Sequence, residues 1–430
     1  MNRKIKRIAI FSFILIMGGV GYQLTRRPQA RESVALPHEC YIWQRVWNDD
    51  LRESIQQAKA DLHGLVVLAA EIDVRPGDEK QIIVPVDYSF LSTLSVPAGI
   101  AIRINPYSGP FDQDAPAMRS IRQVIETVLE KAGGAGLEPV EVQIDYDCAE
   151  SKLAGYRQWI QAIKQDFPDY PIVITALPSW MNNRQFKKLV RDSDGYVLQV
   201  HSLERPTTVD EEIVLCDPKC SVEWVRQADR LGMPFRLALP TYGYLVAYNQ
   251  QGQFTGLSAG GSMPGWSENT QIKTVLSDPK KIAAMIQEIQ TISPKNLSGV
   301  IWFRLPVAGD QLNWQWHTLQ RIIQGQPLNE NIEVLLEWPH PYLAEVYLVN
   351  SGDVDVTDAI TVRLEFAGDC LAADGVLGYA VQEDQERRLL IYAENRLPFQ
   401  RLRSQEKTKI AWCRFNTETE VKANVQKDLQ

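Results

Sequence analysis

The stretch VEVQIDYDCAE, residues 140–150, begins as a strand and ends in acids. Apolar and polar residues alternate through its first half, which is the two-residue period of a strand with one buried face. The run closes on two aspartates, Asp145 and Asp147, immediately before a helical segment. Because successive side chains of a strand point to opposite faces, these two carboxyl groups share one face. Burying a charge costs free energy unless something compensates it, so the surroundings of this face determine what the acids do.

The same unit, an apolar strand followed by an amphipathic helix, recurs along the chain from about residue 40 to about residue 325. The strand-like runs begin at Tyr41, Gly64, Ala98, Val140, Tyr170, Gly195, Pro234 and Ser298. The segments between them mostly show the 3.6-residue period of amphipathic helices. The second unit is irregular, since residues 72–87 are typical of an inserted hairpin that precedes a short helix.

Eight β/α units over roughly 285 residues have the number and the size of a (β/α)8 TIM barrel. A doubly wound open sheet is the alternative fold. Such sheets usually have fewer strands and often carry a glycine-rich nucleotide fingerprint, which this sequence lacks. The sequence therefore predicts an α/β fold, with a closed barrel over residues 35–325.

Beyond the barrel, residues 326–430 consist of short runs in which apolar and polar residues alternate, separated by turn residues. This pattern predicts a small C-terminal all-β sandwich. The junction QGQPLNEN, residues 324–331, is short, so we expect the two domains to pack together.

The N-terminal segment, residues 1–34, has the features of an export signal. The basic sequence MNRKIKR precedes an uncharged run over residues 8–25, and two arginines follow. The run is at the short limit for a membrane-spanning helix, which needs about 17 to 25 residues. We expect an uncleaved anchor in the inner membrane, with a cleaved signal peptide as the alternative. Either one predicts an exported protein, in the periplasm or at the cell surface.

The six cysteines of the chain fit an oxidising compartment. Two disulfides are predicted, one between Cys216 and Cys220 and one between Cys370 and Cys413. Cys40 opens the first strand and Cys148 follows the fourth, at opposite ends of a barrel about 20 Å high. That separation is beyond the reach of a disulfide, so we expect these two cysteines not to pair.

Charge and motifs restrict the classes of partner. The net charge is -8 and the isoelectric point is about 5.4, which argues against a nucleic-acid partner. The sequence contains no phosphate-binding loop, and its five histidines are too scattered to suggest a metal site. We therefore predict that the protein uses no metal and no cofactor.

In barrel enzymes the chemistry takes place at the carboxyl ends of the strands. If the acidic face of the fourth strand is the barrel interior, Gln143, Asp145 and Asp147 line it up to the mouth. Two neighbouring carboxylates repel each other, which raises the pKa of one of them. A protonated acid beside a carboxylate is the arrangement that cleavage of a glycosidic bond requires. A helix cap plus an ion pair is the competing interpretation of this acid pair.

The run VEVQIDYD resembles the fourth-strand motif of chitinase-type (family 18) glycoside hydrolases, D-x-x-D-x-D-x-E. In this resemblance Gln143 and Asp145 fall on two of the aspartates, and Asp147 falls on the catalytic glutamate. YPIVITALP resembles the fifth strand, and GYVLQVHS resembles the sixth, with Gln199 and His201 where the family has Met and Tyr. The chain is also similar to an uncharacterised family of exported bacterial proteins with glycoside-hydrolase-like barrels.

The last two strands continue the resemblance, since FRLALPTYGY resembles the seventh and GVIWFRLP the eighth. It implies that Asp147 is the acid and that Asp145 is its electrostatic partner. The residues that position a glycan would then be Tyr242, His201 and Gln199. An aspartate at the glutamate position places the proton donor about 1 Å short, which can cost about a hundredfold in rate. A non-catalytic barrel that binds a glycan or a protein is therefore the alternative function.

Further side chains at the expected strand ends are candidates for the mouth. Glu71, Arg103 and Arg304 are predicted either to contact substrate or to form ion pairs. Trp302, on the eighth strand, is predicted to stack on a sugar ring. The glycine-rich segment 249–269 is predicted to be a substrate lid that carries Trp266.

Overall fold

The computed structural model describes residues 36–75, 79–201, 206–259, 265–267, 269–385, 387–394 and 401–427. The predicted membrane segment, residues 8–25, lies outside these ranges. Among the helices within them, none combines the length and the apolar character needed to cross a bilayer.

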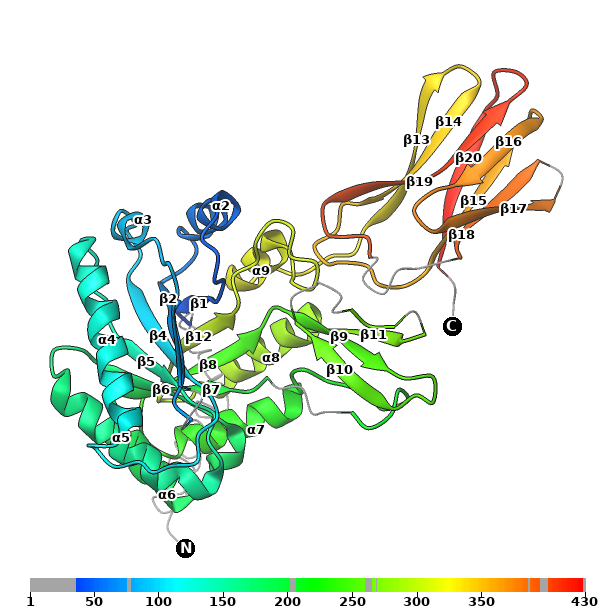
Figure 1. The fold of residues 1–430 in the computed structure, drawn as a ribbon. Coiled ribbons are helices and arrows are strands. Elements are labelled where there is room, and N and C mark those ends of the chain that lie inside the picture. The colour runs from blue at the N-terminus through cyan, green and yellow to red at the C-terminus, as the bar shows by residue number, and fades with distance from the viewer. Residues whose placement is uncertain are drawn as a thin grey trace, which may run out of the picture.

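A closed ring of parallel strands forms the first part of the chain (Figure 1). Each strand pairs with the next one in chain order, and the last pairs with the first, which closes the ring. The eight strands are β1 (His38–Ile42), β2 (Gly64–Asp73), β4 (Ala98–Ile104), β5 (Val142–Asp145), β6 (Ile172–Ala176), β7 (Gly195–Gln199), β8 (Phe235–Pro240) and β12 (Leu297–Phe303). The predicted eight-stranded barrel is confirmed.

Amphipathic helices cover the outside of the ring (Figure 1). They are α2 (Asp49–Ala58), α3 (Tyr88–Ser92), α4 (Pro116–Gly134), α5 (Leu153–Asp166), α6 (Arg184–Asp192), α7 (Pro218–Asp229), α8 (Pro279–Ile292) and α9 (Trp316–Ile323). Several begin at a residue whose side chain accepts a hydrogen bond from the first helical turn, as Asn48, Asp217 and Asp278 do. The irregular second unit contains β3 (Lys80–Ile83), antiparallel to β2, before α3, as predicted.

The interior of the ring is filled in layers. Apolar inward-facing side chains form a cluster that is separate from the larger core between strands and helices; its buried members are Tyr41, Val66, Ala101, Val173, Val197, Ala238 and Ile301. Below this layer Arg236 donates to both carboxylate oxygens of Glu141, at 2.7 and 2.8 Å, and pairs with Glu39. The barrel floor therefore carries charges that compensate one another, as burial requires.

A three-stranded antiparallel sheet follows β8, in the order β10-β9-β11. Its strands are β9 (Gly243–Tyr248), β10 (Phe254–Ser258) and β11 (Gln271–Leu276). The prediction of one long loop over residues 249–269 is therefore wrong for its first part, which contains β10. Residues 260–264 and 268 of that segment lie outside the described residues.

The C-terminal part is rich in β structure and consists of two four-stranded antiparallel sheets (Figure 1). One contains β13 (Ile332–His340), β14 (Leu343–Asn350), β19 (Glu406–Phe415) and β16 (Cys370–Gly375). The other contains β17 (Tyr379–Gln385), β18 (Arg388–Ala393), β15 (Ile360–Phe366) and β20 (Val421–Lys427). A single buried cluster draws on both sheets, which fits the predicted sandwich.

Charged contacts join the two parts. The Asp353 carboxylate lies 2.8 Å from Nε2 of His317 and 3.2 Å from Nε of Arg321, both on α9. It also accepts a hydrogen bond from the backbone N–H of Asn329, in the junction. One carboxylate of the β-rich part is thus held by the last barrel helix and by the linker.

The predicted disulfides are wrong, because all six cysteines are free: Cys40, Cys148, Cys216, Cys220, Cys370 and Cys413. Cys216 is buried whereas Cys220 is exposed on α7, so the two side chains lie in different surroundings. In the β16–β19 ladder Cys370 is opposite Phe415 rather than Cys413. The expectation that Cys40 and Cys148 do not pair agrees with the structure.

Candidate active site

Three charged side chains lie side by side at the carboxyl ends of neighbouring strands. In the register of the ring, Glu71 on β2 is the partner of Arg103 on β4, and Arg103 is the partner of Asp145 on β5. Asp145 is buried, and its Oδ1 accepts hydrogen bonds from the Thr175 hydroxyl at 2.8 Å and from Nε2 of Gln199 at 3.3 Å. The next two strands of the ring therefore hold this carboxylate in place.

Asp147 lies two residues beyond Asp145, past the end of β5, and is exposed. Among the described residues none donates a hydrogen bond to its carboxylate. The short helix that follows, η1 (Glu150–Lys152), has Ala149 at its N-cap and no side-chain cap. The interpretation of Asp147 as a helix cap is therefore excluded, and its carboxyl group is available to a ligand.

The two acids influence each other's protonation. Burial raises the pKa of Asp145, while the charge of Arg103 and the hydrogen bond from Thr175 act in the opposite direction. Desolvation by the surrounding protein and the charge of Asp145 together raise the pKa of Asp147 to about 7, again against the effect of Arg103. At neutral pH the pair therefore contains a carboxyl group that can give up a proton or take one up.

Gln143 does not reach the mouth. It is fully buried one layer below Asp145, where its Oε1 accepts a hydrogen bond of 2.7 Å from the Tyr41 hydroxyl. Its amide Nε2 donates to Glu141 at 2.6 Å, which connects it to the charged floor of the barrel. The prediction that Gln143 binds substrate is therefore wrong, because both ends of its side chain are already occupied by the interior.

The other predicted charged residues differ in how far they are engaged. Glu71 is buried and receives two hydrogen bonds from Arg45, at 2.7 and 2.6 Å. Arg304 forms an ion pair with Asp310 at 3.0 Å. Arg103 is exposed, and none of the described residues forms a hydrogen bond or an ion pair with it.

A cluster of four aromatic side chains, Trp43, His201, Tyr242 and Phe303, forms an aromatic wall at the carboxyl ends of β1, β7, β8 and β12. Nδ1 of His201 lies 3.3 Å from the Tyr242 hydroxyl, and the imidazole stacks on Phe303 with a centroid distance of 5.5 Å. Phe303 in turn contacts Trp43, at 5.2 Å between ring centroids. Burial lowers the pKa of His201 to about 4, so its ring is neutral near pH 7. The wall thus combines apolar ring faces with neutral hydrogen-bonding groups.

Trp302 is not part of this wall. It is fully buried on the outer face of the ring, where its Nε1 donates to Nδ1 of His38 at 3.1 Å. The prediction that Trp302 contacts a sugar is therefore wrong, and the next residue, Phe303, has the inward position. The alternation of side chains along β12 could have indicated this, since Ile301 points inward and residues two apart share a face.

Thr175 was not predicted, although it lies two residues after the inward-facing Val173 on β6. Trp266 is half-buried, and its Nε1 lies 3.6 Å from the position that a Cβ on Gly256 of β10 would occupy. The structure thus associates Trp266 with the β9–β11 sheet and gives no contact between it and the acid pair.

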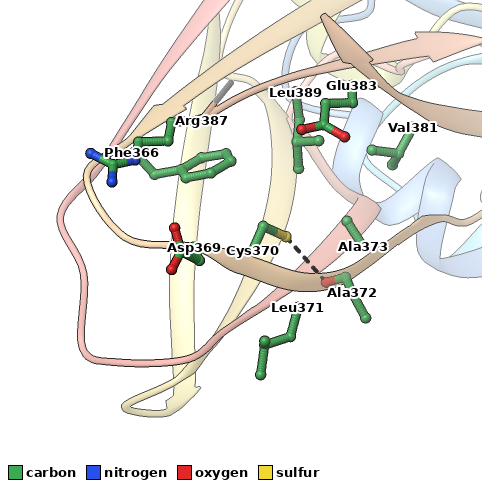
Figure 2. Close-up of a pocket in the computed structure, with 10 residues that line it drawn as sticks. All are labelled: Phe366, Asp369, Cys370, Leu371, Ala372, Ala373, Val381, Glu383, Arg387 and Leu389. Carbon is green, nitrogen blue, oxygen red and sulfur yellow. Dashed lines mark hydrogen bonds between the residues drawn. The ribbon is translucent and has the colours of Figure 1, made fainter. Parts of the chain in front are cut away.

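A pocket with a volume of about 360 Å³ lies in the β-rich part, away from these residues (Figure 2). Its walls come from both sheets and are formed by Phe366, Asp369, Cys370, Leu371, Ala372, Ala373, Val381, Glu383, Arg387 and Leu389. The Cys370 thiol donates to the carbonyl oxygen of Ala372 at the edge of this pocket. No residue of the acid pair lines it, so it is separate from the barrel mouth.

The fold and the mouth together define a class: a (β/α)8 barrel with an acid pair at the carboxyl end of its fourth parallel strand. Residues 97–308 match a family model described as a domain of unknown function, DUF3142. Residues 336–416 match a second one, DUF8456, with the same description. No curated protein matches the chain.

Several solved structures are similar to the barrel. The spore cortex-lytic enzyme SleL of Bacillus cereus is 13% identical with a TM-score of 0.47, and the match covers 68% of this chain and 74% of SleL. A chitinase from Chromobacterium violaceum is 11% identical with a TM-score of 0.47, covering 68% and 98%. A chitinase from Rhizomucor miehei is 10% identical with a TM-score of 0.44, covering 67% and 99%. At these identities the likeness concerns the fold and assigns no activity to this chain.

Proposed function

We propose that this chain is an exported glycoside-hydrolase-like protein that acts on a polysaccharide or a cell-wall glycan. The observation that carries the proposal is the state of Asp147. The residue is exposed, its carboxyl group accepts no hydrogen bond from the described residues, and desolvation together with the charge of Asp145 raises its pKa to about 7. A group of this kind suits proton transfer to the oxygen of a glycosidic bond.

The two acids have different roles in this proposal. Asp147 donates the proton as the bond to the leaving sugar breaks. Asp145, held by Thr175 and Gln199, supplies negative charge beside the positive charge that develops on the sugar ring. No separate carboxylate nucleophile follows from this arrangement, so attack by water with inversion, or attack by a group of the substrate itself, remains the route to test.

The aromatic wall supplies the binding surface. The rings of Phe303 and Trp43 are suited to stack on the apolar face of a sugar. The Tyr242 hydroxyl lies 3.3 Å from Nδ1 of His201 and from the Tyr244 hydroxyl, and Nε2 of His201 has no hydrogen-bond partner among the described residues. In the proposed complex these residues hold the ring while the acids act on its glycosidic oxygen.

A barrel that binds a glycan without cleaving it is the second candidate. It is favoured by the glutamine at position 143, which supplies no third acid and whose amide is bound to Tyr41 and Glu141. It is also favoured by the shorter reach of an aspartate at the position of the proton donor. The aromatic wall serves a binding protein as well as an enzyme.

A screen of soluble polysaccharides and purified cell walls with the wild type and with Asp147→Asn distinguishes the two. The enzyme hypothesis predicts that the wild type releases reducing ends, and that Asp147→Asn retains binding but loses at least about 99% of the rate. NMR of the first product distinguishes inversion from retention. Equal binding without product from both proteins leaves only the binding function.

Export is part of the proposal and rests on the basic and apolar N-terminal sequence, with residues 8–25 as a membrane anchor or a cleaved signal. The free cysteines give it no support. Fractionation of cells that produce the full chain tests it, since a protein confined to the soluble cytoplasmic fraction contradicts export.

A further inference from the structure

Arg103 occupies a central position in the barrel mouth. On β4 it lies between Glu71 on one neighbouring strand and Asp145 on the other. It is exposed, whereas the residues on either side of it in its strand, Ile102 and Ile104, are buried. Its guanidinium group is therefore presented at the mouth between two carboxylates.

Neither carboxylate is committed to Arg103. Glu71 is bound by Arg45 through both of its oxygens, at 2.6 and 2.7 Å. Asp145 is held instead by uncharged donors from β6 and β7, Thr175 and Gln199. In the part of the chain that the structure describes, Arg103 has no hydrogen bond or ion pair of its own.

The other arginines of the mouth show a different pattern. Arg45 is paired with Glu71, and Arg304 is paired with Asp310 at 3.0 Å. Within the described residues, Arg103 is the one arginine of these three whose guanidinium has no carboxylate partner. A planar guanidinium with free donors is suited to bind a carboxylate through two parallel hydrogen bonds.

Arg103 is also close enough to act on the acid pair. Its positive charge partly offsets the rise in the pKa of both Asp145 and Asp147. An anion bound to Arg103 would offset that effect, so the carboxyl group of Asp147 would keep its proton to a higher pH. An acidic ligand would thus favour the form of Asp147 that donates a proton.

We propose that the glycan bound at this mouth is anionic, with a carboxylate on a sugar unit, as in a uronic acid, and that Arg103 binds this carboxylate. The inference rests on the proposed function and specifies its substrate class. Arg103 is then a specificity-determining residue, and neutral glycans of the same backbone bind less tightly.

The test uses three acidic polysaccharides, polygalacturonate, alginate and hyaluronan, each beside a sample whose carboxyl groups have been chemically reduced to alcohols. Affinity electrophoresis measures binding of the full chain and of Arg103→Gln. We expect at least one acidic polymer to bind about tenfold or more tightly than its reduced form. Arg103→Gln should remove this difference, and Arg103→Lys should restore part of it.

Arg230→Gln is the matched control, because Arg230 is also exposed, has the same charge and lies outside the mouth, at the end of α7. It should keep the preference for the acidic polymer. Equal binding of acidic and reduced polymers, or an unchanged preference in Arg103→Gln, overturns this inference and leaves the proposed function standing. Absence of binding to every acidic, reduced and neutral glycan tested overturns both.

Discussion

Arg403, in the β-rich part, donates a hydrogen bond of 2.7 Å to the backbone carbonyl of Asp310, whose carboxylate pairs with Arg304 at the end of β12. Arg401 donates in the same way to the carbonyl of Asn313. Asn313 forms a β-bridge with Tyr242, a residue of the aromatic wall. Two arginines of the C-terminal part therefore hold the loop over residues 310–313, which supports one side of the barrel mouth.

These hydrogen bonds predict that Arg403→Ala weakens glycan binding at the mouth, because the loop over residues 310–313 loses a contact that orders it. We expect a loss of about threefold to tenfold in affinity, consistent with one charged hydrogen bond. Affinity electrophoresis together with thermal unfolding checks it. Lys407→Ala is the control, because Lys407 lies on β19 and pairs with Glu337, and this variant should bind as the wild type does. An unchanged affinity in Arg403→Ala would show that this hydrogen bond does not support the mouth.

The ion pair of Arg401 and Asp355 predicts a larger effect on stability. The two side chains are 5% and 11% exposed and lie 2.8 Å apart. Arg401→Ala leaves a carboxylate in the interior without its partner, which costs about 3–5 kcal/mol. Denaturant unfolding should show this loss. A double variant in which Asp355 is also changed to Ala should recover part of it, and a fully additive loss contradicts the coupling.

The raised pKa of Asp147 predicts a pH-dependent stability. A carboxyl whose pKa is higher in the folded state than its ordinary 3.8 contributes stability that is complete below about pH 4 and is lost as pH rises through about 7. Asp147→Asn removes this loss, so the variant should gain stability relative to the wild type between pH 4 and pH 8. Melting temperatures across that range measure it. A difference that does not change with pH contradicts a pKa near 7.

The same acid pair predicts the effect of Asp145→Asn. An asparagine keeps an oxygen for the Thr175 hydroxyl and removes the negative charge that raises the pKa of Asp147. We expect that pKa to fall, while desolvation keeps it above the ordinary value. Carbon-13 NMR titration of the aspartate carboxyl groups follows it directly. A pKa that stays near 7 would show that the charge of Asp145 has no influence.

Substitutions of the neighbouring residues Trp302 and Phe303 should differ in their effects on stability and on glycan binding. Trp302→Ala should destabilise the fold by about 3–5 kcal/mol, because it empties a fully buried site and removes a hydrogen bond to His38. Phe303→Ala should reduce glycan binding more than stability, since its ring is only partly buried in the aromatic wall. Unfolding and binding measured on both variants compare the two, and the reverse assignment of effects would contradict the structure.

The thiols give a direct chemical check. Titration of unreduced, denatured protein should find six free thiols. In the folded protein the exposed Cys220 should react first, and the buried Cys40 should react only on unfolding. Two or four missing thiols would show that disulfides form after all.

Much of the barrel follows from short-range patterns. The period of two in the strands and of 3.6 in the helices is a property of a few consecutive residues, so all eight strands and the hairpin before α3 are predicted from the sequence. The sheet β9–β11 is not, because β10 lies within a glycine-rich stretch that resembles a loop, and β9 and β11 flank that stretch. The pairing of β9 with β11 joins residues that are far apart in the sequence, such as Tyr248 and Gln271.

The candidate site, too, is predicted from the sequence only in part. Spacing alone places Asp145 and Asp147 on one face. Only the closed ring makes that face the interior and buries Gln143 one layer below the mouth. The register of β12 against β1 and β8 turns Phe303 inward and Trp302 outward. The alternation of side chains along a strand divides them between two faces but does not show which face points into the barrel. That depends on the tilt and pairing of all eight strands together.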